Sequence, residues 1–207
     1  MKTEREFRKC AEFRALDGGE DNAYIVEGYA TTFDQPYVLY SDSQYEFREE
    51  IAPTAFDACD MSDVIMQYDH CGRVFARNRN NTLTLLPDGV GLKTTALLGG
   101  TEIGRQLYEE IKGGYTDKMS FAFVVDSDER SEKTEAGKTI VTRRITGIRK
   151  LYDVSAVSMP ANDTTSISAR SWCDGEIARL EAERLSALNT AKRKLALKIR
   201  LQEEIKK

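Results

Sequence analysis

Short stretches of apolar and β-branched residues alternate with turn-forming residues over the first 168 positions. Such stretches are typical of β-strands, and we expect strands at residues 23–32, 45–51, 81–86, 90–96, 138–145 and 151–160. The sequence Pro87-Asp88-Gly89 lies between two of these segments and predicts a hairpin turn. Strands of this length and spacing predict a barrel or a sandwich.

Two internal segments have the pattern of a helix. Residues 101–112 place apolar side chains four positions apart on one helical face. Thr101 is suited to cap the start of this helix, and Gly113 is suited to end it. A shorter turn is expected at residues 53–58, with Pro53 near its start.

Residues 126–137 are charged and nearly devoid of apolar side chains. A segment of this composition cannot bury apolar surface of its own. We therefore expect an exposed loop without regular structure here.

The composition changes after Trp172. Residues 174–207 contain no proline and one glycine, and they are rich in Ala, Leu, Glu, Lys and Arg, which predicts a long helix. This segment contains nine Lys and Arg and six Asp and Glu, which gives it a net charge of +3. The apolar positions follow no strict heptad, which favours a surface or partner-binding amphipathic helix over one that binds nucleic acid or membrane. We expect one domain at residues 1–170 and a basic amphipathic helical extension at residues 171–207.

Overall composition is that of a soluble globular protein, with 41% hydrophobic and 31% charged residues among 207. The net charge of −4 gives no reason to expect a nucleic-acid partner. No stretch approaches the roughly 20 apolar residues that span a bilayer, and the first residues lack the apolar core of a signal peptide, so a cytoplasmic protein is expected.

Cysteine and histidine usage argues against a metal site. Cys10, Cys59, Cys71 and Cys173 form no Cys-x-x-Cys pair, and the chain has one histidine. A zinc site would need an unusual ligand set. Reduced thiols are expected, and no cofactor or metal.

The single histidine, His70, is the only imidazole that could serve as a catalytic base. Ser120 follows a double glycine in a strand-like segment, where it shares a face with Ala122 while larger apolar residues share the other. A serine hydroxyl becomes a nucleophile when a base takes its proton, and a neutral imidazole can do so.

Asp153 lies in an otherwise apolar strand, and a carboxylate there needs a partner such as His70. Asp69 and Asp117 are competing acids. Cys71 is a competing nucleophile, although neighbours on a strand point to opposite faces. Serine, histidine and aspartate in these settings also fit ordinary structural roles, so the residues alone leave catalysis open. The chain has no Gly-x-Ser-x-Gly elbow, P-loop or dinucleotide-binding motif.

Five segments occur in an order and spacing that resemble the prohead (procapsid maturation) proteases of tailed phages. These are residues 28–33, 49–56, an apolar run that ends at His70, residues 119–123 and residues 152–161. Each segment alone is a weak signal, whereas five in order are specific. The fold of that family resembles the herpesvirus assemblins.

The resemblance implies a serine endopeptidase in which Ser120 is the nucleophile, His70 the general base and Asp153 the acid of the triad. The family often has glutamate at this last position. Assemblins use a second histidine as third member, and this chain has none. The implied fold is α+β and mainly β: an assemblin-like β-barrel flanked by helices, with a C-terminal helical extension.

The resemblance also implies substrates and a place of action. The substrates would be scaffold protein, or a scaffold-like arm of the major capsid protein, and the protease itself, inside a procapsid in the host cytoplasm. A homodimer would fit the assemblin likeness, and no nucleic acid, membrane or cofactor is expected. Two alternatives stay open, a catalytically silent capsid-assembly or scaffold-binding module on the same fold, and a small-substrate hydrolase such as an esterase.

Overall fold

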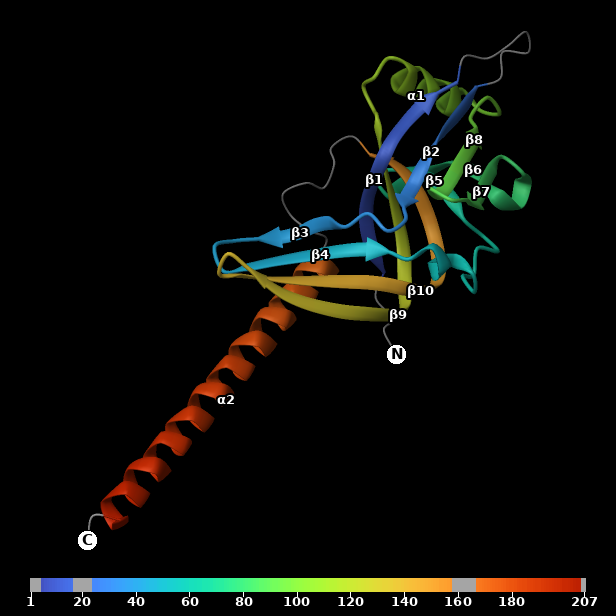
Figure 1. Cartoon of the computed structure of the whole chain (residues 1–207). Coiled ribbons are helices and arrows are strands. Elements are labelled where there is room, and N and C mark those ends of the chain that lie inside the picture. Colours follow the sequence, from blue (N-terminus) through green and yellow to red (C-terminus); the bar gives the residue numbers. More distant parts are fainter. Residues whose placement is uncertain (1–4, 17–23, 158–166, 206–207) are drawn as a thin grey trace.

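The computed structural model describes residues 5–16, 24–157 and 167–205. Within these ranges the chain is mainly β, with two α-helices and two short 3-10 helices (Figure 1). The strands are β1 Glu6–Ala15, β2 Ile25–Thr32, β3 Tyr37–Ser41, β4 Tyr45–Ile51, β5 Ile65–Tyr68, β6 Cys71–Arg77, β7 Leu83–Pro87, β8 Gly91–Leu97, β9 Lys118–Glu135 and β10 Lys138–Val157. The helices are α1 Glu102–Lys112 and α2 Ile167–Ile205, and the 3-10 turns are Pro53–Phe56 and Asn78–Asn80.

All strands join one sheet in the order β3-β4-β10-β9-β1-β2-β8-β7. The long strand β10 pairs in parallel with β4 along its first half and with β5 along its second half, and β6 pairs with β5. Strands β9 and β10 therefore form the centre of the fold. The predicted mainly β, α+β class is confirmed.

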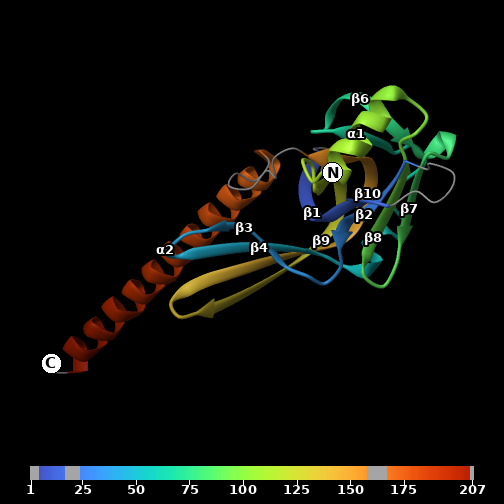
Figure 2. The ribbon, with the colours of Figure 1, turned by 90° about the horizontal axis from the view of Figure 1, so that it is seen from above.

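The predicted closed barrel is not found. Within the described residues the path of paired strands ends at β3 on one side and β7 on the other, and these two do not pair. The long hairpin of β9 and β10 carries β3 and the start of β4 away from β7 and β8 (Figures 1 and 2), and only an isolated bridge, Phe33 with Ile51, links the end of β4 to the residue after β2.

The expectation of a loop at residues 126–137 is wrong. Strand β9 continues to Glu135, and only Ala136 and Gly137 form the turn before β10, both with positive φ (50° and 83°). Two such residues are what a tight antiparallel hairpin favours. Polar composition misled the prediction because residues 126–135 are solvated on both faces of β9, so the strand is held by its pairing with β10 rather than by apolar burial. Ion pairs such as Arg130 with Glu132 line this part of the ribbon instead.

The main hydrophobic core lies between the curved sheet and α1. It contains Met119, Phe121 and Phe123 from β9 and Leu107 and Ile111 from α1, together with apolar residues of β2, β5, β8 and β10. This is the predicted helix at residues 101–112. Its N-cap is confirmed, because the Thr101 side chain accepts a hydrogen bond from the Gly104 backbone N–H (3.1 Å).

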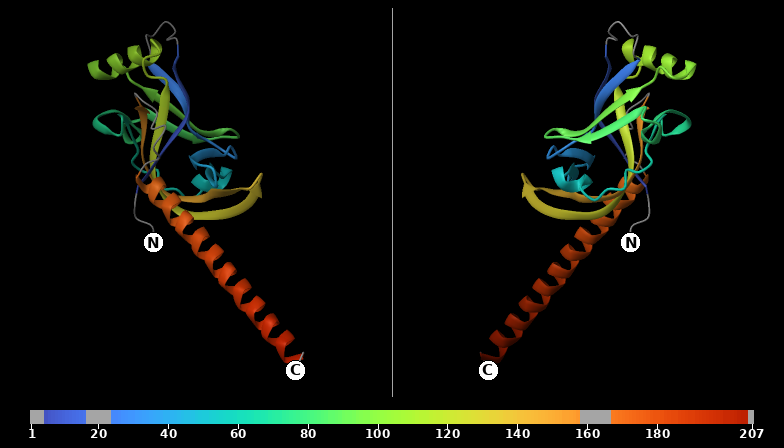
Figure 3. Two further views of the ribbon diagram at one scale, coloured as in Figure 1. Left: turned by 90° about the vertical axis from the view of Figure 1, so that its left-hand side faces the viewer. Right: turned by 90° about the vertical axis from the view of Figure 1, so that its right-hand side faces the viewer.

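The first turns of α2 close a second, smaller core. Cys173 and Leu180 pack there with Tyr45, Phe47 and Val141. The ring of Trp172 meets Phe47 edge to face, with 5.8 Å between ring centroids. The rest of the helix projects from the β-sheet as a straight rod (Figure 3).

A long C-terminal helix was predicted, and α2 confirms it, although it begins at residue 167 and its base is part of the fold. Past Leu180 its leucines are exposed, among them Leu185, Leu188 and Leu195. No helix in the described ranges is both long and apolar enough to cross a membrane.

Candidate active site

A tight turn between β5 and β6 carries the histidine. Tyr68 pairs with Cys71, which leaves Asp69 and His70 as a two-residue turn. Their φ angles are 49° and 56°, in the left-handed region that L-residues rarely adopt. The Asp69 backbone N–H donates to the Ala156 carbonyl (2.9 Å), which ties this turn to β10. His70 therefore lies beyond the end of β5, and its side chain can reach over the neighbouring strands.

Strands β9 and β10 supply the serine and the acid. Ser120 lies in β9 between β1 and β10, and its partner across the β10 pairing is Ser155. Asp153 is the partner of Ala122, so the acid and the serine share one face of the sheet. The predicted alternation is confirmed, because the large side chains Met119, Phe121 and Phe123 are all fully buried on the other face.

The three predicted residues meet at one point. The His70 Nδ1 lies 2.6 Å from Asp153 Oδ1, and its Nε2 lies 2.5 Å from Ser120 Oγ. Ser120 is 6% exposed and Asp153 4%, whereas the imidazole is 17% exposed. Hydrogen-bond contact from nucleophile to base and from base to acid is the geometry that activates a serine. With Nδ1–H donating to Asp153, Nε2 is the acceptor that a general base requires.

Two of the competing candidates, Asp69 and Cys71, flank His70 in the chain, and the third is Asp117. Asp117 is exposed and pairs with the adjacent Lys118 (3.2 Å). The thiol of Cys71 is exposed and approaches the Tyr68 carbonyl (3.7 Å). Asp69 shares the turn with His70, but the carboxylate at Nδ1 belongs to Asp153.

Two further contacts were missed from sequence. The Ser155 hydroxyl donates to Asp153 Oδ1 (2.8 Å), and the Ser120 hydroxyl donates to the backbone carbonyl of Arg8 on β1 (2.8 Å). The first could have been found, because residues 153 and 155 share a strand face. The second depends on the pairing of β1 with β9, and no strand was predicted at residues 6–15.

The side chain of Arg8 leads to a second polar region, on the opposite face of β1 from Ser120. Arg8, Glu6, Glu49 and Arg143 form a buried ion cluster. Arg8 Nη2 lies 2.8 Å from Glu49 Oε2, and Arg143 Nη1 lies 2.8 Å from Glu6 Oε2. Burial alone would lower the pKa of Arg8, but the charges of Glu49, Tyr37 and Glu6 and the hydrogen bond to Glu49 together outweigh burial and raise that pKa.

The carboxylate of Glu6 responds in the opposite direction. Burial would raise the pKa of Glu6, but the hydrogen bond from Arg143 and the charges of both arginines outweigh it, and the pKa is lowered. Glu6, Arg8 and Arg143 therefore keep their charges near neutral pH.

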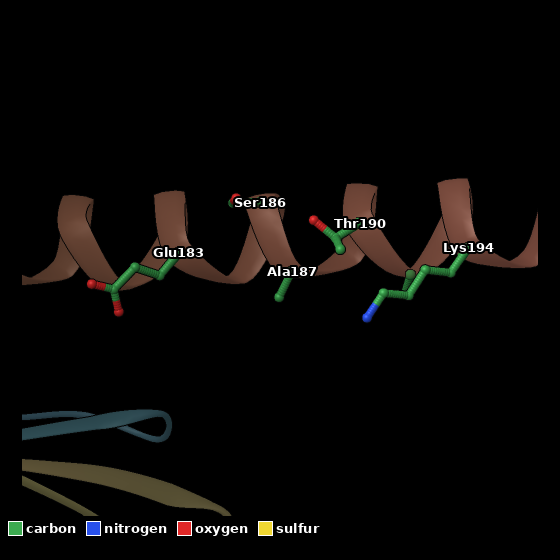
Figure 4. Close-up of a pocket in the computed structure, with 6 residues that line it drawn as sticks. Glu183, Ser186, Ala187, Thr190 and Lys194 are labelled. Carbon is green, nitrogen blue, oxygen red and sulfur yellow. The ribbon is translucent and has the colours of Figure 1, made fainter.

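A groove of about 530 Å³ adjoins the turn that carries His70, between the β5–β6 hairpin and α1. Its lining is mixed, with Tyr68, Phe75 and Leu107 apolar and Arg73 and Glu110 charged. A second, shallow depression runs along α2 past Glu183, Ala187 and Lys194 (Figure 4). Among the described residues, no group of three or more His, Cys, Asp or Glu is arranged to hold a metal ion.

The family model for the caudovirus prohead serine protease matches residues 9–176. The chain belongs to this family. The match runs from β1 into the first turns of α2 and includes His70, Ser120 and Asp153. It confirms the resemblance drawn from the five ordered segments. Neither the curated proteins nor the solved structures give a significant match, so the likeness to assemblins stays a prediction.

Proposed function

We propose that the protein is a serine endopeptidase in which Ser120 is the nucleophile, His70 the general base and Asp153 the acid that orients and stabilises the imidazole. The observation that carries the proposal is the continuous hydrogen-bonded chain from Ser120 through His70 to Asp153. Membership of a serine protease family supports it independently.

The reaction begins as Ser120 Oγ attacks the peptide carbonyl carbon and its proton passes to His70 Nε2. The resulting imidazolium is stabilised by the Asp153 carboxylate. His70 then gives the proton to the leaving amine, and the C–N bond breaks to leave an acyl-enzyme. Water, deprotonated by His70, attacks the ester carbonyl, and the proton returns to Ser120 as the acid product leaves.

The contact from Ser120 to the Arg8 carbonyl bears on the first step. The hydroxyl has one proton and two acceptors within 2.8 Å, the Arg8 carbonyl and His70 Nε2. Only the arrangement that donates to His70 leads to attack. The hydrogen bond to the Arg8 carbonyl therefore holds the serine in place at rest. When substrate binds, the Ser120 hydroxyl must turn its proton from that carbonyl to His70 Nε2.

Family membership points to capsid maturation, and we propose scaffold protein or a scaffold-like arm of the major capsid protein as substrate, inside the procapsid. We also propose that residues 171–207 form an extension that docks the protease to its partners and is removed by self-cleavage near residue 169. The exposed leucines of α2 past Leu180 support a docking role. A cut near residue 169 lies before Trp172, so the released extension would include this residue, whose ring packs on Phe47.

Co-expression with the neighbouring capsid and scaffold proteins, read by intact mass, tests this function. We expect truncated capsid or scaffold protein with the wild type and none with Ser120→Ala. Ser131→Ala, an exposed serine of the same strand, is the matched control and should leave the truncations unchanged. Identical masses in all three, with particles still assembling, would favour a silent assembly module, and turnover of activated esters alone would favour a small-substrate hydrolase.

A further inference from the structure

The Asp153 carboxylate has a second partner besides His70. Ser155 donates its hydroxyl to Asp153 Oδ1 at 2.8 Å, the same oxygen that lies 2.6 Å from His70 Nδ1. Ser155 has no exposed surface, and Asp153 is 4% exposed. In the register of β9 and β10, Ser155 is also the cross-strand partner of Ser120.

This arrangement restricts the acid. An aspartate carboxylate can rotate about its last side-chain bond, which would turn Oδ1 away from the imidazole. A buried hydroxyl on the same oxygen opposes that rotation, because turning away would leave both the hydroxyl and the carboxylate oxygen without this bond in a region closed to water. Ser155 is two residues from Asp153 on one strand face, so the backbone itself sets their separation.

We propose that Ser155 is a positioning residue of the active site, which acts through Asp153 by holding Oδ1 toward His70. The inference rests on the proposed function, since it assigns a role within the triad. A purely structural role for Ser155 would be to satisfy a buried hydroxyl and fill space between strands. The two roles differ in what Ser155 contributes once Asp153 is absent.

The test compares kcat and KM of Ser155→Ala with those of the wild type, on a peptide that spans a cleavage site mapped in the co-expression experiment. We expect kcat to fall about 10-fold to 100-fold, as when a buried carboxylate loses one hydrogen-bond donor, with KM unchanged. Ser155→Thr keeps a hydroxyl at the same position and should recover most of the loss. Thr94→Val is the control for removal of a buried hydroxyl, because Thr94 Oγ1 has no hydrogen-bond partner among the described residues.

The decisive measurement is made in an Asp153→Ala background. If Ser155 acts through Asp153, adding Ser155→Ala should lower kcat no further than Asp153→Ala does alone. An equal fold-loss in both backgrounds, or no rescue by Ser155→Thr, would overturn the proposal. Rates are normalised to the folded fraction, measured by thermal melting of each variant, so that loss of fold is separated from loss of turnover.

Failure of this proposal and failure of the proposed function give different results. If Ser120→Ala is inactive while Ser155→Ala cleaves like the wild type, the protease stands and the role of Ser155 is wrong. If Ser120→Ala still cleaves, the proposed nucleophile is wrong, and the role of Ser155 fails with it.

Discussion

Two buried polar regions meet at β1, and they are built differently. On one face the carbonyl of Arg8 accepts the hydroxyl of Ser120, which leads on to His70 and Asp153. On the other face the guanidinium of Arg8 enters the ion cluster with Glu6, Glu49 and Arg143. The first region holds one carboxylate, one imidazole and hydroxyls, whereas the second holds two cations and two anions.

The difference separates buried polarity that can carry out chemistry from buried polarity that maintains structure. In the ion cluster each charge stabilises its neighbours, so the pKa of Arg8 is raised and that of Glu6 is lowered, away from any value at which either would exchange a proton near neutral pH. In the candidate site the imidazole lies between a hydroxyl and a carboxylate and is partly exposed. A histidine in that position can both take and return a proton.

The largest expected effect is on activity alone. His70→Asn should lower kcat/KM by at least about 10⁴-fold, because the serine loses its base. Asparagine tolerates the left-handed backbone that His70 adopts, so the turn and the stability should be kept. Cleavage of the mapped peptide and thermal melting of the same sample check both parts. If His70→Asn still cleaved the peptide, the region of Ser120, His70 and Asp153 would not be the one that carries out chemistry.

The sequence predicted this site better than it predicted the framework that supports it. Strand alternation predicted the faces of Ser120 and Asp153, and His70 has no competing histidine, but only the resemblance to the prohead proteases joined the three in one predicted triad. The ion cluster could not be predicted, since Glu6, Glu49 and Arg143 come from three strands whose pairing depends on the whole sheet. The turn at His70 was missed for a related reason, because the left-handed backbone of two non-glycine residues is imposed by the pairing of β5 with β6 and β10.

The second prediction concerns stability instead of activity, and the expected effect is again large. Arg143→Met should lower the free energy of unfolding by about 3–5 kcal/mol, because Glu6 and Glu49 would be left buried without one of their cations. Arg144→Met removes the adjacent arginine, which is partly exposed and pairs with Glu50, and should cost less than about 1 kcal/mol. Urea unfolding measures both. Equal losses would mean that burial does not distinguish the two arginines.

A third, smaller effect concerns the acid side of the stability profile. The pKa of Glu6 is lower in the folded protein than its ordinary value of 4.5, so its ionisation stabilises the fold above pH 4.5. That contribution is lost as the pH falls below 4.5 and through the folded pKa. Urea midpoints between pH 7 and pH 3 should therefore fall more steeply for the wild type than for Glu6→Gln. Parallel profiles would show that Glu6 contributes nothing to the acid sensitivity.

The mildest test leaves both regions intact and probes a thiol beside each. Cys71 follows His70 and is exposed, whereas Cys173 at the base of α2 is 2% exposed, and burial raises its pKa to about 12. Because the thiolate is the reactive form, iodoacetamide at pH 8 should alkylate Cys71 in the native protein and leave Cys173 unmodified until urea unfolds the chain. Peptide mass mapping identifies the modified thiol, and Cys71→Ser supplies the blank. Equally rapid alkylation of Cys173 would mean that the base of α2 opens readily beside the ion cluster, so that this side of β1 is as accessible as the side of His70.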